Sequence, residues 1–120
     1  MAARLDVQKT YKLYIGGQFP RTESGRSTKA LTADGKLLAH TCHASRKDLR
    51  NAIVVARQAA AGWAGRTAYN RGQILYRMSE MMEGKAEEFA ATIKASTGDS
   101  IRAARREVEA SIDRLVAFAG

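Results

Sequence analysis

The sequence contains little of what a disulfide-bonded, exported or membrane-spanning protein needs. Cys42 is the single cysteine in 120 residues, so no disulfide can form within the chain, which is typical of a reducing compartment. Residues 1–10 have neither the apolar core nor the small-residue cleavage pattern of a signal peptide. No apolar run approaches the roughly 20 residues that cross a bilayer. We therefore expect a cytoplasmic protein without a membrane partner.

Soft metal ligands and nucleophiles are also scarce, because His40, Cys42 and His43 are the only histidines and cysteine. On a strand, His40 and Cys42 share a face and His43 points away. Two ligands are too few for a zinc site, which needs three or four. A nucleophilic Cys42 would have only His40 as its base, and no oxyanion hole is evident. These patterns favour ordinary surface or half-buried side chains.

No glycine-rich phosphate loop is present, since Gly16-Gly17 lacks the strand–loop–helix context of a dinucleotide-binding turn. The carboxylates of Glu107, Glu109 and Asp113 are spaced as exposed helix charges and not as a catalytic pair. We therefore predict no catalytic, cofactor-binding or metal-binding residue in this chain.

The charge balance is basic, with 20 Lys and Arg against 12 Asp and Glu and a formal charge of +8. Such a balance raises the prospect of nucleic acid or an anionic surface as a partner. However, the densest basic cluster, Arg102, Arg105 and Arg106, is followed at once by Glu107 and Glu109, which is typical of a solvated helix face. Nucleic-acid binding therefore stays a disfavoured alternative.

Residues 1–10 are predicted as a tail, after which the pattern becomes strand-like. Residues 11–15 alternate at period two, and Gly16-Gly17 suits the positive φ angles of a tight hairpin turn. The return strand begins at Gln18-Phe19 and ends at Pro20, which has no N–H donor.

A second hairpin is predicted downstream of a turn at Glu23-Ser24-Gly25. Its strands are 28–32 and 37–43, joined by Asp34-Gly35, a two-residue hairpin signal. Residues 11–44 thus form a segment of two short hairpins, which are marginal alone and need a covering element.

From residue 45 onward the hydrophobic period is helical. Ser45 and Asp48 form a capping-box pair at the start of the first helix. Gly62 is expected to end it, and Trp63 just beyond is expected to anchor the corner as a large apolar side chain. The apolar face consists of Leu49, Ala52, Ile53 and Ala56.

The second and third helices are expected between Thr67, a cap, and Gly98, a stop, with Gly84 breaking the pattern between them. A methionine-rich stripe can mark an adaptable binding groove, but at helical spacing it favours core. The stripe consists of Ile74, Leu75, Met78, Met81 and Met82. The third helix carries Phe89, Ala90 and Ile93.

The fourth helix is expected to begin after Ser100, with Arg105 and Glu109 paired on its outer face. The apolar run 116–119 before Gly120 predicts a chain cut short. The buried stripe recurs every three or four residues and comprises Ile101, Ala104, Val108, Ile112, Leu115 and Ala119.

In their order and spacing, these signals resemble the N-terminal segment of the NAD(P)-dependent aldehyde dehydrogenase superfamily over about residues 11–120. Residues 11–25 and 67–71 look most like an actinobacterial-type, partly degenerate branch. The motifs that carry the resemblance are Tyr14 to Phe19, Asp34-Gly35, Ser45 to Ala61 with Trp63, Asn70-Arg71 with Ile74-Leu75, Thr97-Gly98, and residues 107–115 with Ala119-Gly120.

The resemblance implies an α+β chain of two hairpins and about four helices, which is an incomplete part of the α/β aldehyde dehydrogenase fold. Residues 45–120 would be the helical segment of an incomplete cofactor-binding domain. Family members oxidise an aldehyde to an acid with NAD or NADP through a cysteine, a glutamate base and a glycine-rich turn. None of these falls within the match, and Cys42 does not align with the nucleophile.

We therefore expect this chain to be inactive alone. Its partner would be the rest of a dehydrogenase fold or a dehydrogenase subunit, and family members are usually homo-oligomers. The chain departs from the family pattern at two places. Leu31-Thr32 stands where the family usually has Asn-Pro. Ser96 and Asp99 flank Thr97-Gly98 where the family usually has an acidic residue and a lysine, and the missing acidic residue puts the structural cation site of some members in doubt. The alternatives are a non-catalytic interaction module that binds a dehydrogenase, and a small basic nucleic-acid-binding protein.

Overall fold

The computed structural model describes residues 9–120, which fold into three strands followed by four helices. The expected α+β class is confirmed. The chain forms two compact units whose boundary, after Gln58, lies inside the first helix. The elements are β1 (Thr10–Tyr11), β2 (Ser27–Leu31), β3 (Leu37–Cys42), α1 (Arg46–Ala64), α2 (Ala68–Gly84), α3 (Ala86–Thr97) and α4 (Ile101–Ala119).

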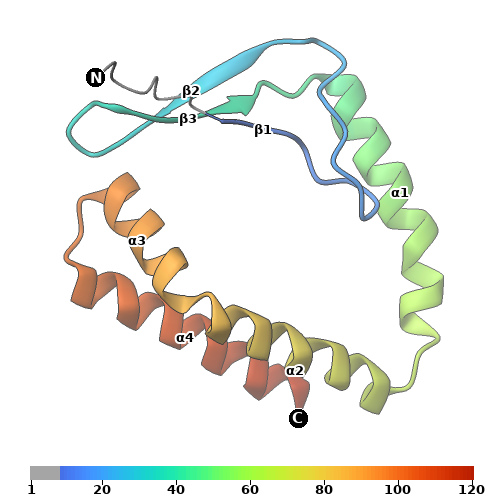
Figure 1. The fold of residues 1–120 in the computed structure, drawn as a ribbon. Coiled ribbons are helices and arrows are strands. Elements are labelled where there is room, and N and C mark those ends of the chain that lie inside the picture. The colour runs from blue at the N-terminus through green and yellow to red at the C-terminus, as the bar shows by residue number, and fades with distance from the viewer. Residues whose placement is uncertain (1–8) are drawn as a thin grey trace, which may run out of the picture. The chain divides into compact units, whose positions relative to one another are not determined.

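The sheet has β3 as its central strand, in the order β1-β3-β2 (Figure 1). The antiparallel β2–β3 ladder runs from Ser27 opposite Cys42 to Leu31 opposite Leu37, which confirms the second hairpin. On its other side β3 pairs in parallel with β1, where Tyr11 lies opposite Thr41. The N-terminal strand therefore joins the same sheet as the second hairpin.

The turn between β2 and β3 is longer than the two-residue turn that Asp34-Gly35 predicts. The N–H of Thr32 donates to the carbonyl of Lys36 (2.7 Å) and that of Gly35 to the carbonyl of Thr32 (3.0 Å), which leaves three residues, 33–35, in the loop. The Thr32 hydroxyl favours this longer turn because it donates to Asp34 and accepts from the Lys36 N–H at 3.0 Å. A three-residue loop ending in a glycine of positive φ is the next most common hairpin connection.

The first hairpin has the predicted turn but only a short ladder. Gly16 and Gly17 have φ angles of 64° and 77°, and Ile15 and Gln18 exchange backbone hydrogen bonds of 3.0 and 3.1 Å across them. The alternating segment 11–15 is nevertheless not one strand of this hairpin. Tyr11 belongs to β1, whose backbone pairs with β3 instead.

The first helix continues past the glycine that was expected to end it. Gly62 and Trp63 are both helical, and α1 ends only at Ala64, where the N–H of Gly65 bonds to Ala61 at 2.9 Å. A single glycine costs about 1 kcal/mol in a helix, and the alanines before it favour continuation. Trp63 therefore lies in the last turn with 42% of its surface exposed, so the expected corner anchor is wrong for this chain.

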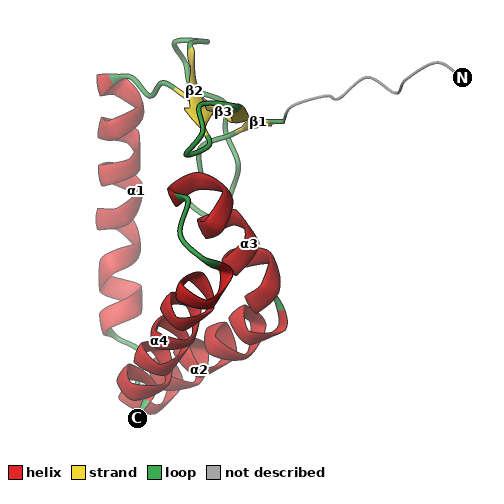
Figure 2. Ribbon diagram, turned by 90° about the vertical axis from the view of Figure 1, so that its left-hand side faces the viewer, coloured by secondary structure: helices red, strands yellow, loops and turns green. Residues whose placement is uncertain are grey.

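The helices of residues 59–120 pack around α4, which contacts both α2 and α3 (Figure 2). The predicted caps are confirmed: Thr67 and Ser100 accept N–H bonds of 3.1 Å each, and Gly98 ends α3 with φ of 77°. The predicted stripe of α4 supplies the centre of the core, where Val108 is only 2% exposed. Ala90 and Ala104 complete this cluster, and Met82, Ala86, Ile93, Ile101 and Ile112 pack against it.

The buried face of α2 differs from the predicted methionine stripe. Gly72 and Ser79 are buried on it, whereas Met78 and Met81 are exposed, the latter by 59%. Small residues let α2 approach α4 closely, and the Ser79 hydroxyl is satisfied by the Tyr76 carbonyl at 2.6 Å. Assigning core by side-chain size was therefore wrong for two of the five residues of the stripe, Met78 and Met81.

The outer face of α4 also differs from its predicted pairing. Arg105 binds Glu87 of α3 through three hydrogen bonds of 3.0 to 3.3 Å, and not Glu109 on its own helix. Hydrogen bonding and charge attraction from Glu87 raise the pKa of Arg105. The pair exists because α3 lies against α4, which an analysis of one helix at a time does not show.

Adding a methyl group at Gly72 tests the α2–α4 contact. A Cβ there would lie 2.3 Å from the carbonyl oxygen of Ala119, so the helices would have to separate. We expect Gly72→Ala to lower the free energy of unfolding by about 1–3 kcal/mol, measured by urea unfolding of this chain.

The matched control is Gly62→Ala, which meets no atom within 4 Å on helical α1. It should stabilise the chain by about 0.4–1 kcal/mol, as glycine replacement does at a compatible helical site. Equal effects of the two substitutions would show that the backbone contact between Gly72 and Ala119 is absent.

Candidate functional site

In the first unit, the side chain of Asp48 joins the start of α1 to the turn before β2. Its carboxylate accepts hydrogen bonds from the Thr22 hydroxyl, from the Glu23 N–H at 3.3 Å and from the Ser45 N–H at 2.9 Å. The Asp48 N–H in turn donates to the Ser45 hydroxyl at 3.2 Å, which confirms the capping box. The residue is 7% exposed, so this cluster is a structural tie.

The hydrogen bonds lower the pKa of Asp48. The backbone N–H of Ser45 has the largest effect, followed by the Thr22 hydroxyl, and burial opposes both. A lowered pKa keeps the carboxylate charged at neutral pH and makes it a weaker base than a free aspartate, which does not favour a role in proton transfer. Sequence analysis found the Ser45–Asp48 pair but missed Thr22, because no spacing rule connects residues 26 positions apart.

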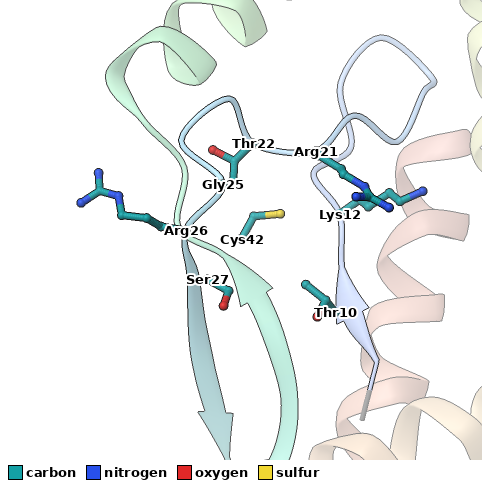
Figure 3. Close-up of a pocket in the computed structure, with 8 residues that line it drawn as sticks. All are labelled: Thr10, Lys12, Arg21, Thr22, Gly25, Arg26, Ser27 and Cys42. Carbon is teal, nitrogen blue, oxygen red and sulfur yellow. The ribbon is translucent and has the colours of Figure 1, made fainter. Parts of the chain in front are cut away.

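The cavity nearest to a reactive side chain lies beside Cys42, between β1, β3 and the turn at residues 21–26. It has a volume of about 420 Å³. The Cys42 thiol donates to the Tyr11 carbonyl at 3.2 Å. Figure 3 shows the basic side chains of Lys12, Arg21 and Arg26 extending away from the sulfur. Their cationic ends therefore do not surround the thiol, and this setting gives no support for a thiolate nucleophile.

Neither histidine that the sequence places near Cys42 lines this cavity. His40 lies two residues earlier on β3, and His43 lies beyond the end of the strand. Within residues 9–120 no group of three or more His, Cys, Asp or Glu side chains could hold a metal ion. The three soft ligands are thus close in sequence without forming a common site.

A different kind of feature appears on α2 and α4, where large apolar side chains remain uncovered. A cavity of about 580 Å³ is lined by Leu75, Ser111, Arg114, Leu115 and Phe118. Phe118 is 79% exposed. A second hollow of about 610 Å³, on another side of the same helix pair, includes Tyr69, Tyr76 and Val116. Exposed apolar surface on a folded chain is typical of interaction sites and ligand-binding grooves.

In the part of the chain that the structure describes, no helix combines the length and the apolar character that crossing a membrane requires.

Comparison with known proteins decides what kind of chain carries these surfaces. Residues 20–120 match the model of the aldehyde dehydrogenase family. The chain belongs to this family. It is 31% identical to malonate-semialdehyde dehydrogenase of Halalkalibacterium halodurans over 120 residues, which are 98% of this chain and 24% of that protein. It is 30% identical to α-ketoglutaric semialdehyde dehydrogenase of Bacillus subtilis over 94% of this chain and 24% of that protein.

Solved structures of the family agree in fold. The NAD-dependent aldehyde dehydrogenase of Sinorhizobium meliloti superimposes with a TM-score of 0.89 at 23% identity, over 95% of this chain and 24% of that one. The chain therefore corresponds to an N-terminal segment of an aldehyde dehydrogenase family protein, as its sequence indicates, and spans about a quarter of the length of the relatives it matches.

The Asp48 tie predicts how stability depends on pH. Because the folded pKa of Asp48 lies below the ordinary value of an aspartate, the stabilisation is present above the unfolded pKa and is lost as pH falls through the folded pKa. We expect Asp48→Asn to lower the melting temperature at neutral pH, and the difference in melting temperature from the native chain to shrink as pH falls below about 5.

Circular dichroism melts of this chain across that range would measure the gap. Asp113→Asn, at an exposed carboxylate on α4, is the control for loss of one negative charge. A constant difference between Asp48→Asn and the native chain at all pH values would contradict the role given to the Asp48 carboxylate.

Proposed function

We propose that this chain is the N-terminal part of the cofactor-binding domain of an oxidoreductase that converts an aldehyde to a carboxylic acid with NAD or NADP. By itself the 120-residue chain is inactive. The protein works in the cytoplasm, and its complete form assembles from identical subunits, as family members usually do.

This proposal is supported by two facts that agree: large apolar side chains of the chain stay exposed, and the chain matches only part of the length of its relatives. The helices α2 and α4 leave Met81, Tyr76 and Phe118 exposed, and the chain spans only 24% of its relatives. A segment of a larger fold combines a native-like backbone with apolar faces that other segments cover. An independent small domain would bury such side chains in its own core.

The residues of this chain do not fit a nicotinamide dinucleotide. Such a cofactor is bound by a glycine-rich turn between a strand and the N-terminus of a helix. Gly16-Gly17 instead joins two extended residues, Ile15 and Gln18. Gly98 lies between two helices, α3 and α4. We therefore assign cofactor binding and the chemical steps to residues outside this chain.

A dehydrogenase assay of the purified chain tests the proposed inactivity. With NAD or NADP and a panel of aldehydes that includes malonate semialdehyde, the 120-residue chain should form no reduced cofactor. The native gene product, purified from its own reading frame, should form it with at least one aldehyde. Turnover by the 120-residue chain alone would overturn the proposal.

Cys42 provides a second test in the same assay. Its thiol bonds to a backbone carbonyl and has no histidine beside it in the cavity. We therefore expect Cys42→Ser to leave kcat and KM of the native gene product unchanged. A loss of activity by orders of magnitude would place the nucleophile within this chain.

Binding experiments separate the proposal from the interaction-module alternative. Such a module would be retained by a separate, complete dehydrogenase, and the association would depend on concentration. Under our proposal the contacts lie within one polypeptide, so the native product should not require a second gene product for activity.

A further inference from the structure

The cavity beside Cys42 has a lining whose charged side chains are all positive. They are Lys12, Arg21 and Arg26, and no carboxylate lies among the lining residues. All of these residues belong to the first unit, so the cavity forms within one compact part of the chain. A concave surface that carries charge of one sign concentrates ions of the opposite sign.

The register of the first hairpin brings Lys12 and Arg21 together. The N–H of Leu13 donates to the carbonyl of Pro20 at 3.0 Å, in register with the bridge beside the turn. One residue further from the turn, Lys12 therefore lies opposite Arg21. Side chains that are opposite each other on two neighbouring strands share a face. Both residues line the cavity, and Figure 3 shows both side chains extending to the same side, away from Arg26.

Two like charges held opposite each other destabilise a hairpin, and a charge of opposite sign between them offsets their repulsion. Within residues 9–120 no ion pair includes Lys12 or Arg21. The same lining adds the hydroxyls of Thr10 and Ser27, which donate hydrogen bonds. The lining therefore combines two adjacent cations with neutral donors, which is the chemistry that holds an anion with several oxygen atoms.

The charge and the size of the cavity indicate the class of anion. Arginine and lysine are the side chains that most often bind phosphate oxygens. Two adjacent cations match the two charges of one phosphate group, whereas a nucleic acid is bound through a series of phosphates. The volume of about 420 Å³ lies within the roughly 300–1,000 Å³ of small-molecule sites, so it leaves space for an organic group beside the phosphate.

We propose that Lys12 and Arg21 bind the phosphate group of a small phosphate monoester in the cavity beside Cys42. The site goes beyond the proposed oxidation of an aldehyde, and it is separate from the nicotinamide cofactor, whose binding we assign to residues outside this chain.

Calorimetric titration of the native gene product with glycerol 3-phosphate, and separately with inorganic phosphate, tests the site at constant ionic strength. The variants are Lys12→Gln and Arg21→Gln, each of which changes an exposed side chain. The matched control is Lys29→Gln, which removes one positive charge from an exposed position of β2 that does not line the cavity.

We expect the native product and Lys29→Gln to bind glycerol 3-phosphate alike and to bind inorganic phosphate more weakly. Lys12→Gln and Arg21→Gln should each raise the dissociation constant for glycerol 3-phosphate roughly 10- to 100-fold, because each removes a charged hydrogen-bond donor. The proposal would be overturned by any of four results: no binding to the native product, unchanged binding in both variants, an equal loss in Lys29→Gln, or inorganic phosphate binding as tightly as the ester. None of these results bears on aldehyde oxidation, so the proposed function stands or fails by its own assay.

Discussion

The structure depends on how little apolar surface the chain can bury by itself. Within residues 9–120 the buried hydrophobic side chains are Ala39, Ala90, Ala104 and Val108, and Val108 is the one large side chain that is almost fully buried. Burial of apolar surface is the main force that offsets the conformational entropy lost on folding. Three of these four residues are alanines, so much of the large apolar surface of the described residues stays exposed.

The two units meet this constraint by different means. In residues 59–120, small side chains let α2 and α3 approach α4 closely, and Glu87 and Arg105 tie α3 to α4 across its outer side. In the first unit, hydrogen bonds contribute more than apolar burial to holding the elements together. The buried Asp48 carboxylate connects a turn, the residue before α1 and the helix itself, so local geometry is fixed there without a large core.

Local signals predicted the elements well because their causes are local. Ser45, Thr67 and Ser100 cap helices with their own hydroxyls, and Gly16-Gly17 forms the turn that its positive φ angles allow. The family resemblance was confirmed over most of the chain because it rests on the order and spacing of such signals.

What could not be predicted depends on contacts between elements. Side-chain size alone assigned Met78 to the core, whereas packing against α4 selects Gly72 and Ser79. The same holds for Arg105, whose partner lies on α3, and for Thr22, whose partner lies 26 residues away.

The intact mass of the native gene product, measured from cells with the unedited reading frame, tests the central claim most directly. The account predicts a species several times heavier than the 13.1 kDa of these residues, because an N-terminal quarter of an aldehyde dehydrogenase needs the remainder to bury its helices. A stable, monomeric product of 13.1 kDa would contradict it, since the uncovered faces of α2 and α4 would then be compatible with an independent protein.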